Sequence, residues 1–200
     1  MKRIFLAATL AACLILSSCG FLSGGKGAGE LSLPKTAVTT INGVTRTDQY
    51  FHDKVIKRAD GFYEVFSRRL SDNTSDVANI RYLFAPDGTP VGNKTNSSES
   101  GEQYWIDLYE TSLETYTEAY AASGMLDRAD GGKLYLTNGS YEEIETDGDR
   151  ITQIRSYDQY GILRVEIRLN SFGQTEFFSI DFDDDVNDVK IFTTYQMIEP

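Results

Sequence analysis

The chain has 200 residues, with 30 Asp or Glu against 19 Lys or Arg, and a formal net charge of −11 at pH 7. A chain this acidic is repelled by phosphate groups, which excludes nucleic acid as an expected partner and gives anionic headgroups no attraction for its surface. With two cysteines and one histidine it cannot assemble a His/Cys metal site, so we expect no metal centre and no cofactor.

The first nineteen residues have the features of a secretory signal. Lys2 and Arg3 precede residues 4–16, an uncharged apolar run. A run of that length is too short for a transmembrane helix, which needs about 20 apolar residues, but it is typical of a signal peptide. A signal cleaved further along the chain, with Cys19 incidental, is the alternative.

The end of this run, Leu16-Ser17-Ser18-Cys19, resembles the lipobox of bacterial lipoproteins. The resemblance implies that the Cys19 thiol receives a diacylglyceryl group, that the bond between Ser18 and Cys19 is cleaved, and that the new N-terminus is acylated, palmitate being a typical chain. Two or three acyl chains anchor a protein stably. We therefore expect an exported protein that is lipid-anchored in the cell membrane or outer membrane. Gly20 stands where an Asp would retain such a protein at the inner membrane, so in a bacterium with two membranes the resemblance favours the outer one.

The sequence therefore predicts three parts: a signal peptide (residues 1–18), a lipidated cysteine with a flexible Gly-rich tether (19–35), and a single domain (36–200). Cleavage removes Lys2, Arg3 and Cys13, which leaves a formal side-chain charge of −13. Apart from the lipidated residue, the mature chain then holds no cysteine for a disulfide or a nucleophile.

In the first half of the domain, residues 36–47 predict a hairpin around Asn42-Gly43. Phe51, Val55, Ile56 and Ala59 recur at helical spacing after Asp48, so we expect a short helix over 48–59. Residues 62–70 and 78–84 predict two strands, followed by a turn at 85–88 and a polar loop over 89–101.

A row of aromatic residues predicts the main helix, over residues 102–122. Its alternative is a strand over 104–110 followed by a shorter helix capped at Thr111. Such a stripe either packs in the core or lines a cleft that binds sugar or lipid, and the candidate ligand-facing residues are Trp105, Tyr109, Tyr116 and Tyr120.

The last third alternates between apolar and charged residues, most clearly over 163–169. Strands are also predicted over 133–137, 141–146, 150–157, 176–182 and 189–195, joined by short links into an antiparallel meander. The motifs at 158–161 and 170–173 form a quasi-repeat twelve residues apart, which indicates repeated hairpin geometry.

These elements predict an α+β fold with one or two helices packed on a curved antiparallel β-sheet that ends in a C-terminal β-meander. In outline this is similar to the LolA- and LppX-type lipoprotein carriers, through strand pattern over about the last 65 residues. A cystatin-like or NTF2-like arrangement fits the same pattern.

No catalytic site is marked in the sequence. The acidic stretch 181–188 lacks the Gly and Glu that an EF-hand requires, and His52 has no Gly-x-Ser-x-Gly partner motif. We expect a cell-envelope lipoprotein, not an enzyme, with a binding or envelope-assembly role. Its partners would be the membrane through the anchor and another envelope protein or an apolar ligand. The alternative is a carrier of an apolar ligand or lipid, and a hydrolase with a carboxylate pair comes third.

Overall fold

The computed structural model describes residues 30–72, 77–95, 112–182 and 188–200, which form one helix and a single antiparallel sheet of twelve strands. The helix is α2 (Leu113–Ala122). The strands are β1 (Leu31–Ile41), β2 (Val44–Lys57), β3 (Tyr63–Ser71), β4 (Val77–Phe84), β5 (Pro90–Thr95), β6 (Leu126–Asp130), β7 (Lys133–Leu136), β8 (Tyr141–Asp147), β9 (Arg150–Tyr157), β10 (Leu163–Leu169), β11 (Thr175–Ile180) and β12 (Val189–Ile198).

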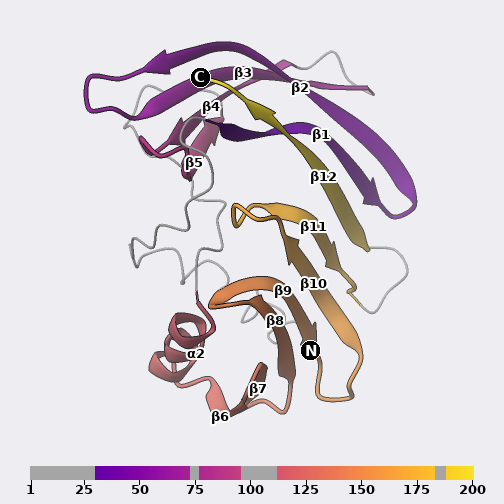
Figure 1. The fold of residues 1–200 in the computed structure, drawn as a ribbon. Coiled ribbons are helices and arrows are strands. Elements are labelled where there is room, and N and C mark those ends of the chain that lie inside the picture. Colours follow the sequence, from indigo (N-terminus) through magenta and orange to yellow (C-terminus); the bar gives the residue numbers. More distant parts are fainter. Residues whose placement is uncertain (1–29, 73–76, 96–111, 183–187) are drawn as a thin grey trace.

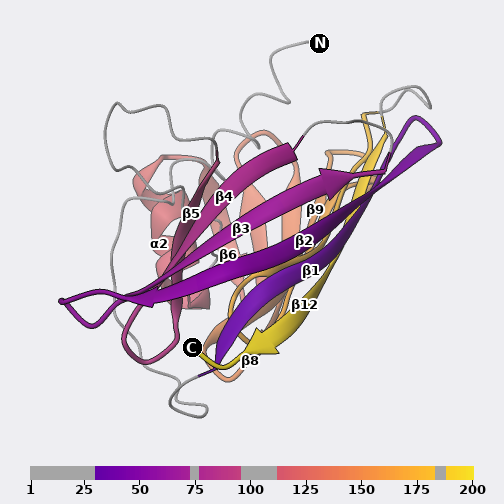
Figure 2. The same cartoon turned by 90° about the horizontal axis from the view of Figure 1, so that it is seen from above.

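The order of strands across the sheet is β5-β4-β3-β2-β1-β12-β11-β10-β9-β8-β7-β6. Strands that follow one another in the chain are neighbours everywhere except at β5 and β6, which lie at opposite edges. The first and last strands meet in the middle, where β1 pairs with β12 from Leu31 opposite Ile198 to Ile41 opposite Val189. Figures 1 and 2 show a strongly curved sheet with α2 on its concave side.

Five of the hairpins close with the same five-residue turn. In each, the first residue donates its N–H to the fifth carbonyl, and a glycine in the fourth place donates back to the first carbonyl; these glycines are Gly61, Gly88, Gly139, Gly161 and Gly173. Their φ angles lie between 76° and 89°, a conformation that glycine adopts without steric cost. The predicted quasi-repeat is confirmed as two copies of this turn.

The face of the sheet that carries α2, the inner face, holds two hydrophobic clusters. The first joins the helix to β7–β10 and contains Tyr116, Tyr120, Leu134, Ile144, Ile151, Ile154, Ile167 and Leu169. The second contains Leu31, Leu33, Val65 and Phe84, so the start of β1 packs against β3 and β4. The opposite face, the outer face, carries alternating charged and aromatic residues and no layer of described residues covers it.

The contact between β1 and the turn after β4 is very close. A Cβ atom added to Gly88 would lie 2.7 Å from the backbone oxygen of Glu30. Only glycine therefore fits between the β4–β5 turn and the beginning of β1.

The predicted α+β class is wrong, because the described chain is predominantly antiparallel strand with one short helix. Residues 48–59, whose spacing predicts a helix, belong largely to β2, where the apparent helical spacing comes from a register shift between His52 and Lys54. Strand β5 occupies part of the predicted loop 89–101, and β6 has no counterpart among the predicted strands.

The remaining predictions are confirmed for the sheet and its hairpins, but the helix and the tether have other bounds than predicted. The curved antiparallel sheet, the Asn42-Gly43 hairpin and the C-terminal meander are confirmed. The helix begins at Leu113 with Ser112 as its N-cap, later than the predicted residue 102 and nearer to the alternative cap at Thr111. Strand β1 begins at Leu31, so residues 31–35, predicted as tether, lie in the sheet.

We predict that Gly88→Ala lowers the free energy of unfolding by about 2–4 kcal/mol, because the new methyl group meets the Glu30 carbonyl at a strained φ angle. Gly148→Ala is the matched control, since Gly148 also has positive φ but nothing lies within 4 Å of the position that its methyl group would take. Urea unfolding of both variants measures the difference, and equal losses would show that the Glu30 contact contributes nothing.

Candidate functional site

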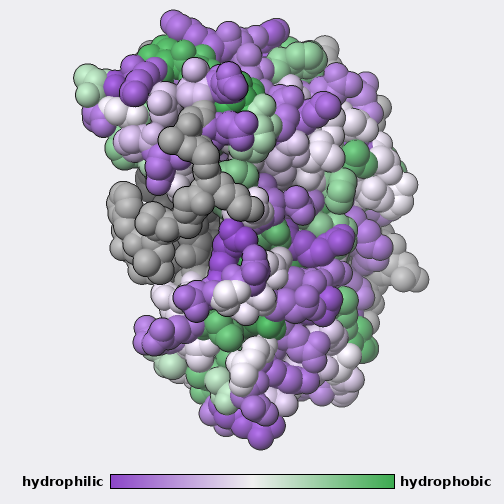
Figure 3. Space-filling view, in the orientation of Figure 1, coloured by the Kyte–Doolittle hydropathy of each residue, from purple (hydrophilic) through white to green (hydrophobic). Residues whose placement is uncertain are grey.

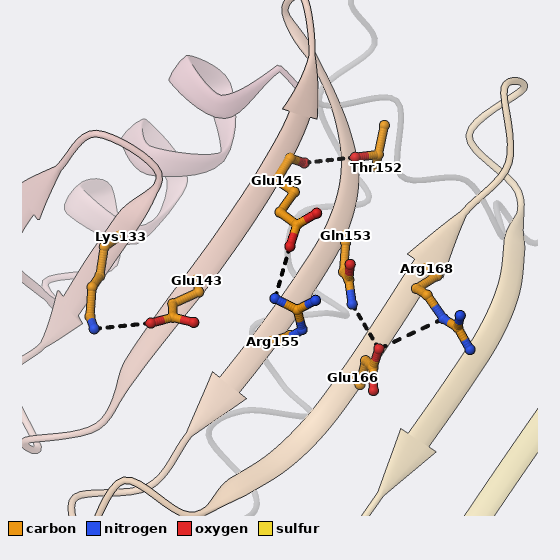
Figure 4. Close-up of polar contacts among 8 residues, drawn as sticks. All are labelled: Lys133, Glu143, Glu145, Thr152, Gln153, Arg155, Glu166 and Arg168. Carbon is orange, nitrogen blue, oxygen red and sulfur yellow. Dashed lines mark hydrogen bonds and ion pairs between the residues drawn. The ribbon is translucent and has the colours of Figure 1, made fainter.

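The outer face over β7–β10 is covered by compensated charges. Figure 4 shows Lys133 paired with Glu143 at 3.1 Å and Arg155 with Glu145 at 2.8 Å. Beside them, Glu166 accepts a hydrogen bond from Gln153 at 2.7 Å and lies 3.7 Å from Arg168. Opposite charges therefore face each other across neighbouring strands, so the charged groups of this surface are paired with one another.

A row of tyrosines runs beside these charges. Tyr135, Tyr141 and Tyr157 stand directly opposite one another on β7, β8 and β9. The rings of Tyr141 and Tyr157 stack at 4.7 Å, and Lys133 and Arg128 cover the faces of Tyr141 and Tyr135 at 4.0 and 3.9 Å. These contacts take up ring surface of Tyr135 and Tyr141 that a sugar would otherwise stack on.

The outer face also has a shallow recess of about 260 Å³ between β2, β3 and β4. Asp53 and Arg68, which form a bidentate pair with both distances 2.7 Å, line one side of it. Arg81, stacked 4.7 Å over the Phe66 ring, lines the other. The recess is open and has a mixed polar and apolar lining, and its charged groups are already paired.

The inner face carries a continuous apolar row that extends beyond the helix. Five β-branched residues stand directly opposite one another on β10, β11, β12, β1 and β2: Val165, Ile180, Val189, Ile41 and Val44. We call these the apolar row. Val165 packs against the core under α2, whereas Ile41 and Val44 at the far end are 47% and 69% exposed. With strands about 4.8 Å apart, the row spans roughly 19 Å.

A polar cluster lies next to the exposed end of this row. Asp48, buried in the sheet, accepts hydrogen bonds from Ser71 Oγ at 2.5 Å and from Arg46 at 3.2 Å. Arg69 reaches the same carboxylate only at 3.9 Å. We call Arg46, Asp48 and Arg69 the arginine cluster.

Under α2, a third polar group is buried more deeply. Glu142, only 4% exposed, accepts hydrogen bonds of 2.9 Å from the hydroxyls of Tyr116, Tyr120 and Ser156. Burial raises the pKa of the Glu142 carboxyl, and the three donated hydrogen bonds oppose that rise without cancelling it. Since Tyr116 and Tyr120 come from α2, Glu142 joins the helix to β8.

The residues predicted from the sequence are placed only in part. Tyr116 and Tyr120 lie in the helix–sheet core with rings 5.3 Å apart. Trp105 and Tyr109 lie outside the described residues, as do Ser18 and Cys19. The ligand-facing role of the four aromatic residues, and the lipidation of Cys19, stay predictions.

His52 has a structural environment on the inner face. Its Nε2 lies 2.9 Å from the Pro34 carbonyl, so Nε2 carries the proton, and Nδ1 accepts from Ser67 Oγ at 2.7 Å. Burial lowers the pKa of His52. Both ring nitrogens are therefore occupied by hydrogen bonds in the neutral ring.

The described residues also bear on metal chemistry and on membrane spanning. They contain no group of three or more His, Cys, Asp or Glu side chains placed to hold a metal ion. Within the same ranges, no helix has the length and apolarity needed to span a bilayer. Residues 183–187, the centre of the acidic stretch, are outside these ranges.

The sequence identifies neither the inner nor the outer face as a site. The arginine cluster joins residues about twenty positions apart, which only the register of β2 and β3 brings together. The burial of Glu142 could have been predicted from the sequence. It lies two residues before Ile144 on β8, so both side chains are on the same, buried face.

No known protein family and no curated protein matches this chain. The structure is similar to the crystal structure of a domain from Vibrio parahaemolyticus, provisionally assigned as an outer membrane lipoprotein-sorting protein. The match covers 86% of both chains at 12% identity and a TM-score of 0.32.

We predict that Glu142 and Glu143, adjacent on β8 but on opposite faces, contribute to stability with opposite pH dependence. The pKa of Glu142 is raised by burial, so its contribution is fully present below the unfolded value of 4.5 and is lost as pH rises through the folded pKa. The pKa of Glu143 is lowered by Lys133, so its contribution is present above 4.5 and is lost as pH falls.

Urea unfolding of the wild type, Glu142→Gln and Glu143→Gln between pH 4 and 8 measures both effects. Relative to Glu142→Gln, the wild type should lose stability on going from pH 4 to 8; relative to Glu143→Gln, it should gain. The same sign for both variants would show that the burial of Glu142 does not control its ionisation.

Proposed function

We propose that this chain is a cell-envelope lipoprotein, anchored through Cys19, with a non-catalytic binding role, and that it binds an apolar ligand on the inner face of its sheet. The observation that carries the proposal is the apolar row, which leaves the core under α2 and becomes exposed at Ile41 and Val44. Soluble domains rarely leave a continuous apolar surface uncovered unless it binds something.

The arrangement of the row suits an extended ligand. Its members alternate with outer-face residues along each strand, so the row is a straight line of aliphatic side chains across five strands. An acyl chain lying along it would contact one residue from each strand. This geometry supports the carrier alternative over a site for a compact polar substrate.

The anchor rests on the sequence. The lipobox-like Leu16-Ser17-Ser18-Cys19 supports lipidation, and the acidic composition supports a body that stays off the anionic surface of the membrane. A ligand-binding face on a tethered body can therefore turn towards or away from the bilayer.

A second candidate role, envelope assembly through a protein partner, has support on the outer face. Phe177, Phe192 and Val38 stand opposite one another there on β11, β12 and β1. Phe192 is 49% exposed, although Figure 3 shows hydrophobic residues in small separate patches on the side of the molecule that it presents. Separate patches favour a partner less strongly than the continuous row favours a ligand.

Lipidation is tested by Cys19→Ser. In cells fed radioactive palmitate, the wild-type chain should become labelled and remain with membranes after washing, because the acyl chains hold it there. The variant should lose the label and be released. Retention of Cys19→Ser on washed membranes without label would contradict the anchor.

The binding face is tested with the full chain in phosphatidylcholine nanodiscs and a photoreactive monoacylglycerol. Label should map to peptides of β1, β2 and β12, and Val44→Asp should reduce it about tenfold, as expected from losing the burial of one aliphatic side chain.

Phe192→Asp is the matched control, since Phe192 is similarly exposed on the outer face. It should leave labelling of the inner face unchanged. Loss of label with Phe192→Asp and not with Val44→Asp would place binding on the outer face and contradict the proposal.

A further inference from the structure

The arginine cluster carries an excess of positive charge in an acidic protein. Two guanidinium groups share one carboxylate, Asp48, which is the one acidic residue that β1, β2 and β3 direct to the inner face within the described chain. Against a chain with a net charge of −11, a local surplus of one positive charge on a binding face is a distinct feature.

The two arginines are incompletely paired. Arg46 Nε lies 3.2 Å from Asp48 Oδ1 but out of line for a hydrogen bond, and this buried nitrogen has no other acceptor among the described residues. Arg69 Nε is 3.9 Å from Asp48, beyond hydrogen-bond distance. Their side chains are 42% and 35% exposed, so both arginines are accessible to a further anion, to which their N–H groups could donate.

Within residues 30–72 and 77–95, no ion pair joins Arg46 or Arg69 to an acid other than Asp48. Ser71 already donates to Asp48. Tyr50 is a hydrogen-bond partner of Arg69, but burial raises the pKa of the Tyr50 hydroxyl, which therefore stays neutral at physiological pH. Planar guanidinium groups bind carboxylates and phosphates through paired hydrogen bonds, and a partly desolvated site strengthens them.

The cluster extends along β2 and β3 from the exposed end of the apolar row, with Arg46 nearest to the row and Arg69, opposite Tyr50, farther along the same face. Arg46 follows Val44 by two residues on β2, so both point to the inner face about 7 Å apart. Arg46 is also opposite Thr39, which lies on the same face of β1 as Ile41. An anionic group bound by Arg46 would thus lie beside one end of the apolar row, and the long side chain of Arg69 would approach it from farther along the same face.

We infer that the ligand of the inner face is a single-chain amphipathic anion, with its carboxylate or phosphate between Arg46 and Arg69 and its acyl chain along the apolar row. The inference rests on the proposed function, because it assigns the head group of a ligand whose chain occupies the same face. It adds selectivity for charge, which the row alone does not provide.

The test uses the full chain in phosphatidylcholine nanodiscs and three photoreactive probes with the same acyl chain: a fatty acid, a lysophosphatidic acid and the neutral monoacylglycerol. The acidic probes should label the peptides of β1, β2 and β12 about tenfold more efficiently than the neutral probe, the ratio expected from one charge-assisted hydrogen bond. The acid that labels better identifies whether the site prefers carboxylate or phosphate.

The variant Arg46→Gln/Arg69→Gln should remove this preference while leaving labelling by the neutral probe unchanged. Arg81→Gln/Arg168→Gln is the control for net charge, because both of its arginines stack over phenylalanine rings on the outer face. Arg46→Lys/Arg69→Lys keeps the charge and should retain most of the preference, which separates loss of charge from loss of folding.

Equal labelling of the row by all three probes, or an undiminished preference in the double Gln variant, overturns the anionic head group and leaves the apolar binding face standing. Absence of label from the row with every probe overturns the proposed function as well.

Discussion

The pairing of β1 with β12 is the interaction on which the structure depends. Apart from this pair, every neighbouring pair in the sheet is a hairpin of consecutive strands, so the chain forms two meanders, β1–β5 and β6–β12. The pairing fuses them into one curved surface. It also places Ile41 between Val189 and Val44, and so makes the apolar row continuous from the C-terminal meander into the N-terminal one. Ser32 and Gln174 reinforce the junction through buried hydrogen bonds of 2.6 and 2.9 Å.

A single-layer sheet has to shield apolar side chains from water on both faces, and the two faces do so in different ways. The inner face buries its apolar residues under α2 and under the start of β1. On the outer face, cationic side chains cover aromatic rings and shield them from water. Arg168 lies over Phe177 at 4.2 Å, and Arg81 lies over Phe66 at 4.7 Å. Such stacks hide apolar ring surface while remaining soluble. Ile41 and Val44 at the end of the apolar row have no such cover among the described contacts and remain exposed, as does Phe192 on the outer face.

Local signals in the sequence predict the hairpins well and the helices poorly. Glycine in the fourth turn position, after Asp158 or Asn170 in the first, marks the strand ends. The fourth residue needs a positive φ angle, which few residues other than glycine adopt readily. Strand β2 resembles a helix in sequence because the bulge at Asp53 breaks its alternation. Strand β6 escapes prediction because its exposed edge, with Asp127 and Asp130, carries almost no apolar pattern. The arginine cluster depends on the register between β2 and β3, which no local pattern encodes.

The meeting of the first and last strands also has a consequence for biosynthesis. A chain made or exported from its N-terminus presents β1 long before β12 exists, so the central β1–β12 pair can form only after β12 has been made. Until then β1 has one hydrogen-bonding edge open, and its buried residues Leu31 and Leu33 lack Ile198, the neighbour that packs against their cluster. Long-range pairs of this kind form late because closing a large loop costs chain entropy. Removal of the last strand would therefore leave one edge of β1 unpaired and its buried leucines without this neighbour.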